Sequence, residues 1–168
     1  MKDEYDLSKL KEKKRINSRT KGSSFERKIA KLLNEQFDTK EFSRSPGSGA
    51  FATTHKLPKH LHIYGDLITP QSFKFCIECK KGYNKENIYS LLDNSSALWG
   101  FINQCEKDSQ KCDKLPLVLF QQDRRPILAI TWGNIFDAYI PHITIGSGIE
   151  YAIYKLDDLL ASNQAKWF

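Results

Sequence analysis

The first third of the chain carries apolar residues at helical spacing. Repeats of three and four residues predict an amphipathic helix over residues 24–37. The apolar positions are Phe25, Ile29, Leu32, Leu33 and Phe37. The preceding segment 21–24 (Lys-Gly-Ser-Ser) predicts a loop that ends in a serine N-cap. Residues 1–20 are rich in lysine and nearly free of large apolar side chains, so we expect a basic arm there, either mobile or a frayed helix.

Residues 41–80 alternate between short strand patterns and polar segments. A strand candidate at 41–44 leads into Ser45-Pro-Gly-Ser-Gly49, a loop whose glycines allow close approach to a ligand. The His-rich segment 50–64 contains Pro58 and predicts a long loop. Two further strands follow, at 65–68 and 73–80. The Thr69-Pro-Gln-Ser72 turn between them predicts that they form a β-hairpin.

The second half of the chain repeats this order of elements. Helical spacing of apolar residues at 98–107 is followed by two apolar runs, 116–120 and 126–130, which predict a second hairpin at the buried far edge of a sheet. A strand is expected at 151–154 and a short helix at 156–161. The order of helix, strands, helix, strands predicts one α/β domain with a central mixed β-sheet flanked by helices.

The size and composition fit one such domain in the cytoplasm. The chain has 168 residues, of which 40% are hydrophobic, enough for one compact core. We divide it into an arm, 1–20, and a domain, 21–168. No apolar stretch of about 18 residues predicts a membrane span, and the N-terminus lacks the pattern of a secretory signal. A cytoplasmic protein is the expectation.

The four cysteines are expected to stay reduced thiols. Cys76 and Cys79 have the spacing of a zinc pair but fall in a strand, where side chains three apart point to opposite faces. They could not easily share one ion, so a zinc module is the least favoured interpretation. His60 and His62 also lack a convincing set of partner ligands.

Positive charge is concentrated at the N-terminal end. The formal net charge is +6, yet residues 1–60 hold 15 Lys and Arg against 8 Asp and Glu, whereas residues 61–168 hold 11 against 12. Such an imbalance is typical of a surface that binds the phosphates of nucleic acid. A solvated basic tail would give the same imbalance.

Three residues form a candidate catalytic group. Glu78 and Lys80 are two apart on a predicted strand and project from one face. Asp66 sits on the preceding strand, so pairing across the turn would bring it close to Glu78. The backbone carbonyl of Cys79 could add an oxygen ligand. This set suits Mg²⁺, with Mn²⁺ as a substitute, and phosphodiester hydrolysis. A cross-strand surface ion pair would explain Glu-x-Lys alone, but charges among apolar strands favour a site.

Four ordered segments make the chain resemble a known family. They are Lys21-Gly-Ser-Ser-Phe-Glu-Arg27, Phe42-Ser-Arg-Ser-Pro-Gly-Ser-Gly49, Gly65-Asp-Leu-Ile68 and Ile77-Glu-Cys-Lys80. Together they resemble the archaeal-type Holliday junction resolvases of the PD-(D/E)xK nuclease superfamily, which also occur in viruses. The resemblance implies a restriction-endonuclease-like fold and, for a viral member, the host cytoplasm. The segment 50–64 departs from the family, in which this loop is compact.

The resemblance also assigns roles to individual residues. It implies metal binding by Asp66, Glu78 and Glu26, and catalysis by Glu26, Asp66, Glu78, Lys80 and Ser48. Arg27 and Arg44 fall where the family places arginines near the scissile phosphate. A surface ion pair or a polar loop residue would also explain Glu26, Arg27 and Ser48. The expected DNA contacts are Lys21, Arg27, Arg44, Ser45, Ser48 and Lys81.

The resemblance implies cleavage of four-way DNA junctions by a symmetric homodimer. Trp99 and Phe101 could form an apolar contact between subunits or could belong to the core; the sequence leaves both open. Two other functions remain alternatives. One is another PD-(D/E)xK activity, such as a restriction-like, nicking or flap-cutting repair nuclease. The other is a DNA-binding module without catalysis.

Overall fold

A computed structural model gives the fold of most of the chain. It describes residues 17–46, 64–92, 94–133, 135–146, 149–162 and 164–168. The basic arm up to residue 16, Ser48, His60, His62 and most of the loop predicted at 50–64 lie outside these residues.

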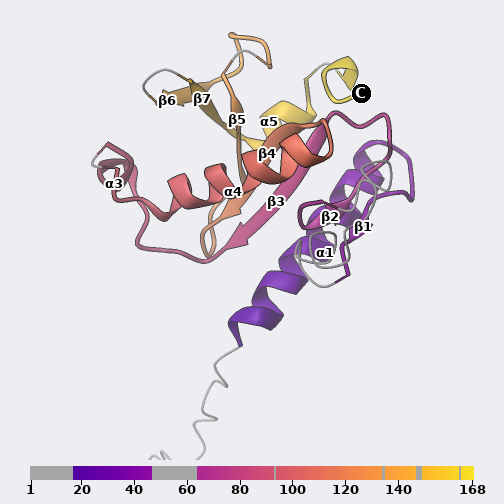
Figure 1. Ribbon diagram of the computed structural model, residues 1–168, viewed down its shortest axis with the longest axis horizontal. Helices are drawn as coiled ribbons and strands as arrows, with labels where there is room; N and C mark the ends of the chain where they lie inside the picture. The colour runs from indigo at the N-terminus through magenta and orange to yellow at the C-terminus, as the bar shows by residue number, and fades with distance from the viewer. Residues whose placement is uncertain (1–16, 47–63, 93, 134, 147–148, 163) are drawn as a thin grey trace, which may run out of the picture.

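A five-stranded mixed sheet forms the centre of the domain (Figure 1). In spatial order its strands are β3 (Phe75–Lys81), β4 (Leu115–Gln121), β5 (Leu128–Trp132), β7 (Tyr151–Lys155) and β6 (His142–Ile145). β3 and β4 are parallel and the other neighbours are antiparallel. The predicted α/β domain with a mixed sheet is confirmed, and β3 and β6 are its two edge strands.

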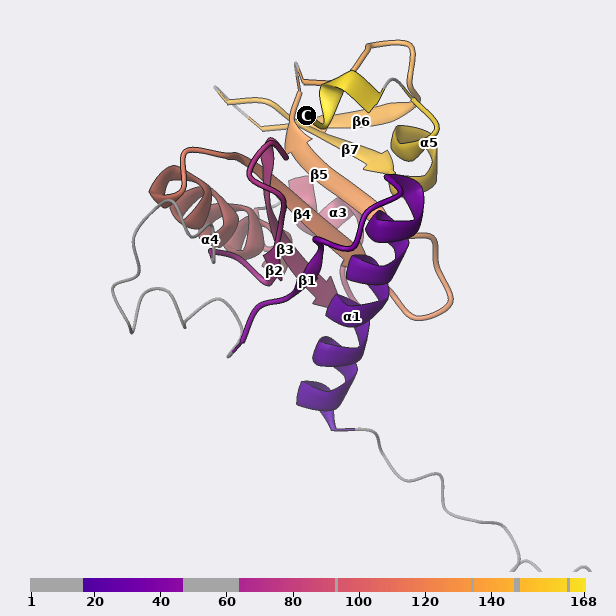
Figure 2. The same ribbon diagram turned by 90° about the vertical axis from the view of Figure 1, so that its right-hand side faces the viewer.

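Two long helices cover the sheet from opposite faces. α1 (Ser18–Gln36) packs against β3, and α4 (Ala97–Lys111) packs against β3 and β4. Figure 2 shows the two helices on different sides of the strands. The shorter elements are α3 (Ile88–Leu92), α5 (Leu156–Leu160) and a 3-10 turn at Gln164–Lys166.

The interior strand β4 is buried on both faces of the sheet. Leu117 and Leu119 point into the core beneath α1, whereas Val118 and Phe120 belong to the core beneath α4. Each of these side chains is at most 3% exposed. A strand buried on both faces is an uninterrupted apolar run in sequence. Burial of this kind, at roughly 25 cal/mol per Å² of apolar surface, is the main force that holds the layers together.

The first helix begins earlier than its sequence pattern predicts. α1 starts at Ser18, with the side chain of Asn17 accepting a hydrogen bond from the Arg19 backbone N–H at 3.1 Å. The predicted loop at 21–24 is therefore wrong. Asn17 is a good N-cap, and a helix tolerates Gly22 at a cost of about 1 kcal/mol. The last residues of the predicted arm 1–20 belong to this helix.

The first predicted hairpin is also wrong. β2 (Leu67–Ile68) pairs antiparallel with β1 (Ser43–Arg44), and these two short strands form a separate sheet beside β3. The turn at 69–72 is present, but it does not pair β2 with β3 in a continuous ladder. The local turn pattern could not reveal that β1, more than 20 residues earlier in the chain, would be the partner.

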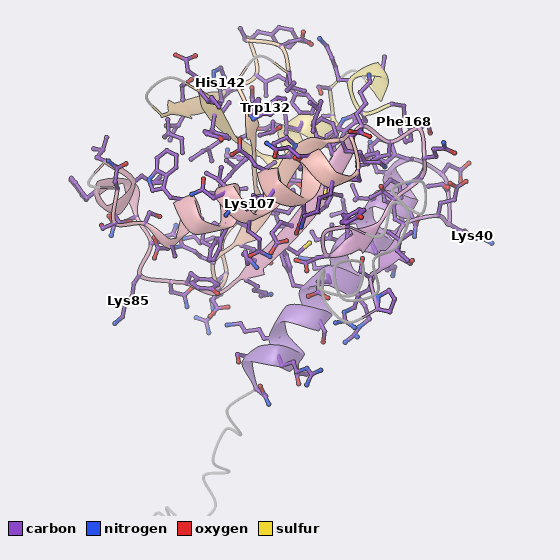
Figure 3. All side chains as sticks on the ribbon, viewed as in Figure 1. Lys40, Lys85, Lys107, Trp132, His142 and Phe168 are labelled. Carbon is purple, nitrogen blue, oxygen red and sulfur yellow. The ribbon has the colours of Figure 1, made fainter. Side chains whose placement is uncertain are left out.

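The second predicted hairpin is confirmed, in a different place. β4 and β5 pair antiparallel, yet they lie at the centre of the sheet and not at its far edge. The reason is that β7 adds to β5 and β6 adds to β7. The predicted helix at 98–107, strand at 151–154 and helix at 156–161 are confirmed as α4, β7 and α5. β6 was missed; its first residue, His142, is labelled in Figure 3, and β7 separates this strand from β5.

An aromatic cluster closes the domain at the start of β3. Phe75 is stacked on Phe136 with ring centroids 5.8 Å apart, and Trp167 contacts both rings. Phe73 stacks on Trp167 with centroids 6.0 Å apart. The Lys74 backbone N–H donates to the Trp167 carbonyl at 2.8 Å. Residues that are distant in sequence therefore share one core.

The cysteines lie as the strand geometry predicts. Cys79 packs in the core beneath α1, whereas the Cys105 thiol on α4 contacts the Cys76 carbonyl at 3.5 Å. All four cysteines are free thiols and buried. In the part of the chain that the structure describes, no helix is long and apolar enough to cross a membrane.

Candidate active site

The candidate site lies along the edge of β3 that does not pair with β4. Ile77 accepts a hydrogen bond from the Asp66 backbone N–H at 2.8 Å, and the Cys79 N–H donates to Asp66 Oδ2 at 2.8 Å. Residues 77 and 79 therefore direct their main-chain groups away from β4. Because the N–H and C=O of one strand residue point to the same side, the Cys79 carbonyl also faces this edge.

Asp66 is held at that edge by its own backbone. Its N–H donates to Ile77 and its carbonyl accepts from the Ser45 N–H at 2.9 Å. The preceding Gly65 has a φ of +78°, and a Cβ at that position would lie 2.6 Å from the Ile77 carbonyl oxygen. Only glycine fits here without a shift of the backbone. The chain therefore passes close enough to β3 for the Asp66 carboxylate to reach the Cys79 N–H.

Glu78 is a buried carboxylate with few partners. Its side chain is 1% exposed, and its Oε1 forms an ion pair with the Lys80 ammonium. Beyond this ion pair, neither carboxylate oxygen has a hydrogen-bond partner among the residues that the structure describes. A buried charge without further partners is costly and marks a place for an additional ligand.

Lys80 is fixed from two sides. The ammonium contacts Glu78 and lies 5.2 Å from the centroid of the Phe101 ring on α4, a distance typical of a cation–π interaction. Tyr83 packs edge-on against the same ring with centroids 4.8 Å apart. The side chain is only 20% exposed. Phe101 is thus a half-buried support for Lys80 from within the same chain.

Burial raises the pKa of both carboxyl groups, and the Asp66 charge raises that of Glu78 further. Burial raises the pKa of Asp66 to about 6, although the Cys79 hydrogen bond and Lys80 oppose the shift. Burial and the Asp66 charge raise the pKa of Glu78 to about 7. Burial lowers the pKa of Lys80, but its attraction to Glu78 and Asp66 and its contact with Glu78 together outweigh burial, and the net shift is upward. Two acids and one ammonium therefore act on one another across a small volume.

The donor set fits a hard divalent cation held by few protein ligands. Asp66 and Glu78 offer carboxylate oxygens, and the Cys79 carbonyl faces the same edge. Mg²⁺ retains several waters and is often bound by one or two carboxylates. Within the described ranges, no group of three or more Asp, Glu, His or Cys side chains is arranged to hold a metal ion. Glu26, predicted as a further metal ligand, is not part of such a group in this conformation.

Glu26 is instead paired with an arginine. The whole residue is 7% exposed, and its carboxylate forms an ion pair with the Nε of Arg44 on β1. Asn34 ties the two elements together, because its side chain donates to the Phe42 carbonyl at 2.8 Å and accepts from the Phe42 N–H at 3.0 Å. Glu26 lies on α1 and Arg44 on β1, and the hydrogen bonds of Asn34 hold these two elements together.

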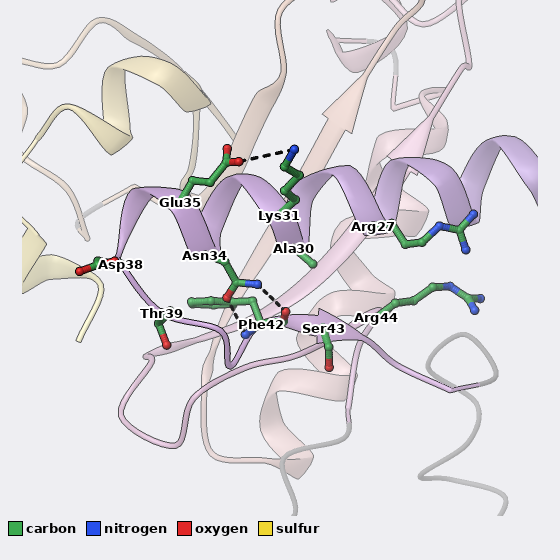
Figure 4. A pocket seen from close by; sticks show the side chains of 10 residues that line it. All are labelled: Arg27, Ala30, Lys31, Asn34, Glu35, Asp38, Thr39, Phe42, Ser43 and Arg44. Carbon is green, nitrogen blue, oxygen red and sulfur yellow. Dashed lines mark hydrogen bonds and ion pairs between the residues drawn. The ribbon is translucent and has the colours of Figure 1, made fainter.

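A groove of about 510 Å³ runs between α1 and the segment that leads into β1 (Figure 4). Arg27 and Arg44 lie side by side at one end of it and point in the same direction. Arg27 is exposed, and its Nη2 lies 3.5 Å from the Ser23 hydroxyl. The two guanidinium groups thus present positive charge next to the candidate site.

The other expected DNA contacts are placed differently. Lys21 forms an ion pair of 2.8 Å with Asp123, and the Lys81 ammonium lies 5.6 Å from the Phe25 ring centroid. Ser45 is fully buried, and its hydroxyl has no hydrogen-bond partner in the described structure. A direct contact between Ser45 and DNA does not fit that burial. Ser48 lies outside the described residues.

Sequence reasoning missed two contributors to the site. Gly65 was quoted only as part of a motif, although its positive φ positions Asp66. Phe101 was considered as core or dimer contact and not as a partner of Lys80. A glycine directly before a candidate acid is a signal that could have been used. The Phe101 contact depends on α4 packing over β3, which no local pattern encodes.

The sequence matches a family of known proteins over most of its length. The family model described as "Phage putative PDDEXK endonuclease" matches residues 17–163. The chain is also 33% identical over 114 residues to Protein D14 of Escherichia phage T5, which covers 65% of this chain and 67% of that protein. No solved structure matches. The residues matched by the family include α1, all seven strands of the described structure and the Asp66–Glu78–Lys80 group. The chain belongs to this family of phage PD-(D/E)xK endonucleases.

Proposed function

We propose that the protein is a Mg²⁺-dependent DNA endonuclease that cleaves four-way junctions. The observation that carries the nuclease part is the Glu78 carboxylate, which is buried beside Asp66 and Lys80. Among the described residues its oxygens have no partner beyond one ion pair. Its selectivity for branched DNA rests on the ordered resemblance to junction resolvases between residues 21 and 80.

In this proposal Asp66, Glu78 and the Cys79 carbonyl hold the cation. A bound Mg²⁺ supplies positive charge and lowers the pKa of a coordinated water. Lys80 stays protonated at neutral pH because the nearby acidic groups, Glu78 first and Asp66 next, together outweigh the effect of burial on its pKa. It therefore acts through its positive charge, stabilising the negative charge that develops on phosphate oxygens, and it can give a proton to the leaving oxygen.

Arg27 and Arg44 bind the phosphates on either side of the cut. Guanidinium groups match phosphate oxygens in two parallel hydrogen bonds, and both arginines point the same way from one end of the groove. The basic residues 1–20 would add contacts to the DNA backbone without reading bases, which makes binding strongly dependent on salt.

A junction cut requires two opposed sites. A two-fold symmetric homodimer would supply them, and we propose that assembly for the DNA-bound protein. Because Phe101 and Trp99 are half-buried within the subunit, the dimer contact need not use them.

One cleavage assay separates the functions. Purified protein with Mg²⁺ is given a four-way junction, a flap and a linear duplex of matched sequence. We expect paired, symmetric nicks on the junction alone. Equal cutting of all three substrates would leave a general PD-(D/E)xK nuclease, which the family membership supports on its own. Binding without cutting in Mg²⁺ and in Mn²⁺ would contradict catalysis and favour a DNA-binding module.

A further inference from the structure

The ion pair between Glu26 and Arg44 lies at the rim of the candidate metal site. The Glu26 side chain is 9% exposed, and the Arg44 side chain is 31% exposed. The contact joins α1 to β1, and Figure 4 shows the Arg44 guanidinium directed outward beside Arg27. One partner is therefore buried near the site, and the other reaches solvent.

Arg44 pairs in register with Leu67, the residue after Asp66, so its ion pair places the Glu26 carboxylate beside the segment that carries Asp66. Burial is the main cause of the raised pKa of Asp66, and the negative charge of Glu26 adds to that shift while Arg44 opposes it. The pKa of the Cys79 thiol is raised by burial and then by the charges of Asp66, Glu78 and Glu26. The carboxylates of Asp66, Glu78 and Glu26 therefore all act on the Cys79 thiol of β3. Among the described residues, however, they are not arranged as a three-ligand metal site.

Building on the proposed function, we infer that Arg44 is a latch operated by phosphate. In the free protein it holds the Glu26 carboxylate away from the metal site. A DNA phosphate that binds the Arg44 guanidinium takes the place of Glu26, and the released carboxylate joins Asp66 and Glu78 as a third metal ligand. The site would then bind its cation tightly only when DNA is present.

Two physical arguments support the latch. A guanidinium pairs equally well with a carboxylate and with a phosphate, so the two compete for Arg44. A released, buried Glu26 would be an unpaired charge, and a divalent cation is the partner that removes this cost. By thermodynamic linkage, DNA that strengthens metal binding is itself bound more tightly in the presence of metal.

The test measures Mn²⁺ binding to the full chain in the absence of DNA, by the electron paramagnetic resonance signal of free Mn²⁺. The variants are Arg44→Gln, Arg44→Lys, Arg27→Gln and the double variant Glu26→Gln with Arg44→Gln. Arg27→Gln is the matched control because it removes a neighbouring positive charge whose contact is Ser23. Circular dichroism confirms that each variant is folded.

We expect Arg44→Gln to tighten Mn²⁺ binding about tenfold, equivalent to about 1.4 kcal/mol. Arg44→Lys should retain weak binding because an ammonium can still pair with Glu26. The gain should vanish in the Glu26→Gln background, since the third ligand is then missing. A short phosphorothioate duplex, which keeps the phosphate charge and resists hydrolysis, should tighten Mn²⁺ binding to the wild type and leave Arg44→Gln unchanged.

The outcomes distinguish the latch from the proposed function. An equal gain from Arg27→Gln, or a gain that persists with Glu26→Gln, would overturn the latch, because loss of positive charge alone would explain it. Failure of the duplex to alter Mn²⁺ binding to the wild type would also overturn it. Failure of the wild type to bind Mn²⁺ under any condition would instead contradict the metal-dependent nuclease.

Discussion

The two halves of β3 perform opposite tasks on one strand. At its start, Phe75 is fully buried and stacked on Phe136 within the aromatic cluster. Three residues later, Glu78 is almost equally buried, but in the described part of the chain its carboxylate has no partner beyond the Lys80 ion pair. The aromatic half stabilises the fold through apolar burial. The charged half holds a group whose burial costs stability, and a site that departs from local rules in this way is typical of function.

The largest effect should come from Lys80. We predict that Lys80→Ala slows DNA cleavage about 10⁴-fold, because the charge that stabilises the reaction is lost, while DNA binding remains. Lys81→Ala is the matched control on the same strand, since its ammonium lies over Phe25 on the other face. It should reduce cleavage much less. Single-turnover cleavage of a labelled junction measures both, and unimpaired cleavage by Lys80→Ala would refute the assignment.

Phe75→Ala should affect the opposite property. We expect the free energy of unfolding to fall by about 4 kcal/mol, as is usual when a buried ring is removed and a cavity remains. Urea denaturation followed by tryptophan fluorescence measures the loss. Phe75→Leu should cost clearly less because it fills more of the space. A loss below about 1 kcal/mol for Phe75→Ala would contradict the stabilising role of the aromatic half.

Gly65→Ala should lower both the free energy of unfolding and the affinity of the site for metal. The new Cβ would meet the Ile77 carbonyl at 2.6 Å and force a residue with a side chain to keep a φ of +78°. We expect a loss of about 2 kcal/mol in unfolding free energy and a shift of Asp66 away from the Cys79 N–H. Mn²⁺ affinity should fall in the folded variant. Wild-type stability together with wild-type metal affinity would show that the backbone adapts at no cost.

Glu78→Gln should stabilise the metal-free protein, in contrast to Phe75→Ala. The pKa of Glu78 is raised by burial from 4.5 to about 7, so between these values the folded state binds more protons than the unfolded state. Wild-type stability therefore falls as the pH rises through this range. At about pH 8 the variant should gain roughly 1 kcal/mol, or about 3 °C in Tm. The gain should shrink toward about pH 5.

Thermal unfolding with a chelator present measures this pH dependence. The sign matters most: a Tm that drops in Glu78→Gln at high pH would mean that the Lys80 ion pair repays the cost of burying the charge. The two halves of β3 would then not differ in the way described.

Periodic elements were predicted well because their signal is local. α4 follows from apolar residues at helical spacing, and β4 and β5 follow from apolar runs separated by polar residues. The pairing of β2 was predicted wrongly because strand partners depend on distant chain segments, here β1. β6 was missed because its four residues are mostly exposed and depend on pairing with β7.

The site was predicted in part for the same reason. Glu78 and Lys80 share a face because they lie two apart on a strand, which sequence alone reveals. Asp66 reaches them through backbone contacts with Ile77 and Cys79, and not through the expected hairpin ladder. The partner of Glu26 could not be predicted, since its ion pair with Arg44 requires α1 and β1 to be packed together. Motifs identified the residues, and tertiary packing determined their partners.

Trp167 has a consequence for how the chain becomes functional during its synthesis. It is fully buried against Phe73 and Phe75, and its carbonyl accepts the Lys74 N–H. The ribosome makes this residue about a hundred positions after the rings that it covers, at roughly 5–20 residues per second. The part of those rings that Trp167 covers therefore stays exposed on the nascent chain until residue 167 emerges from the exit tunnel, and the strand that carries Glu78 acquires its full support only then.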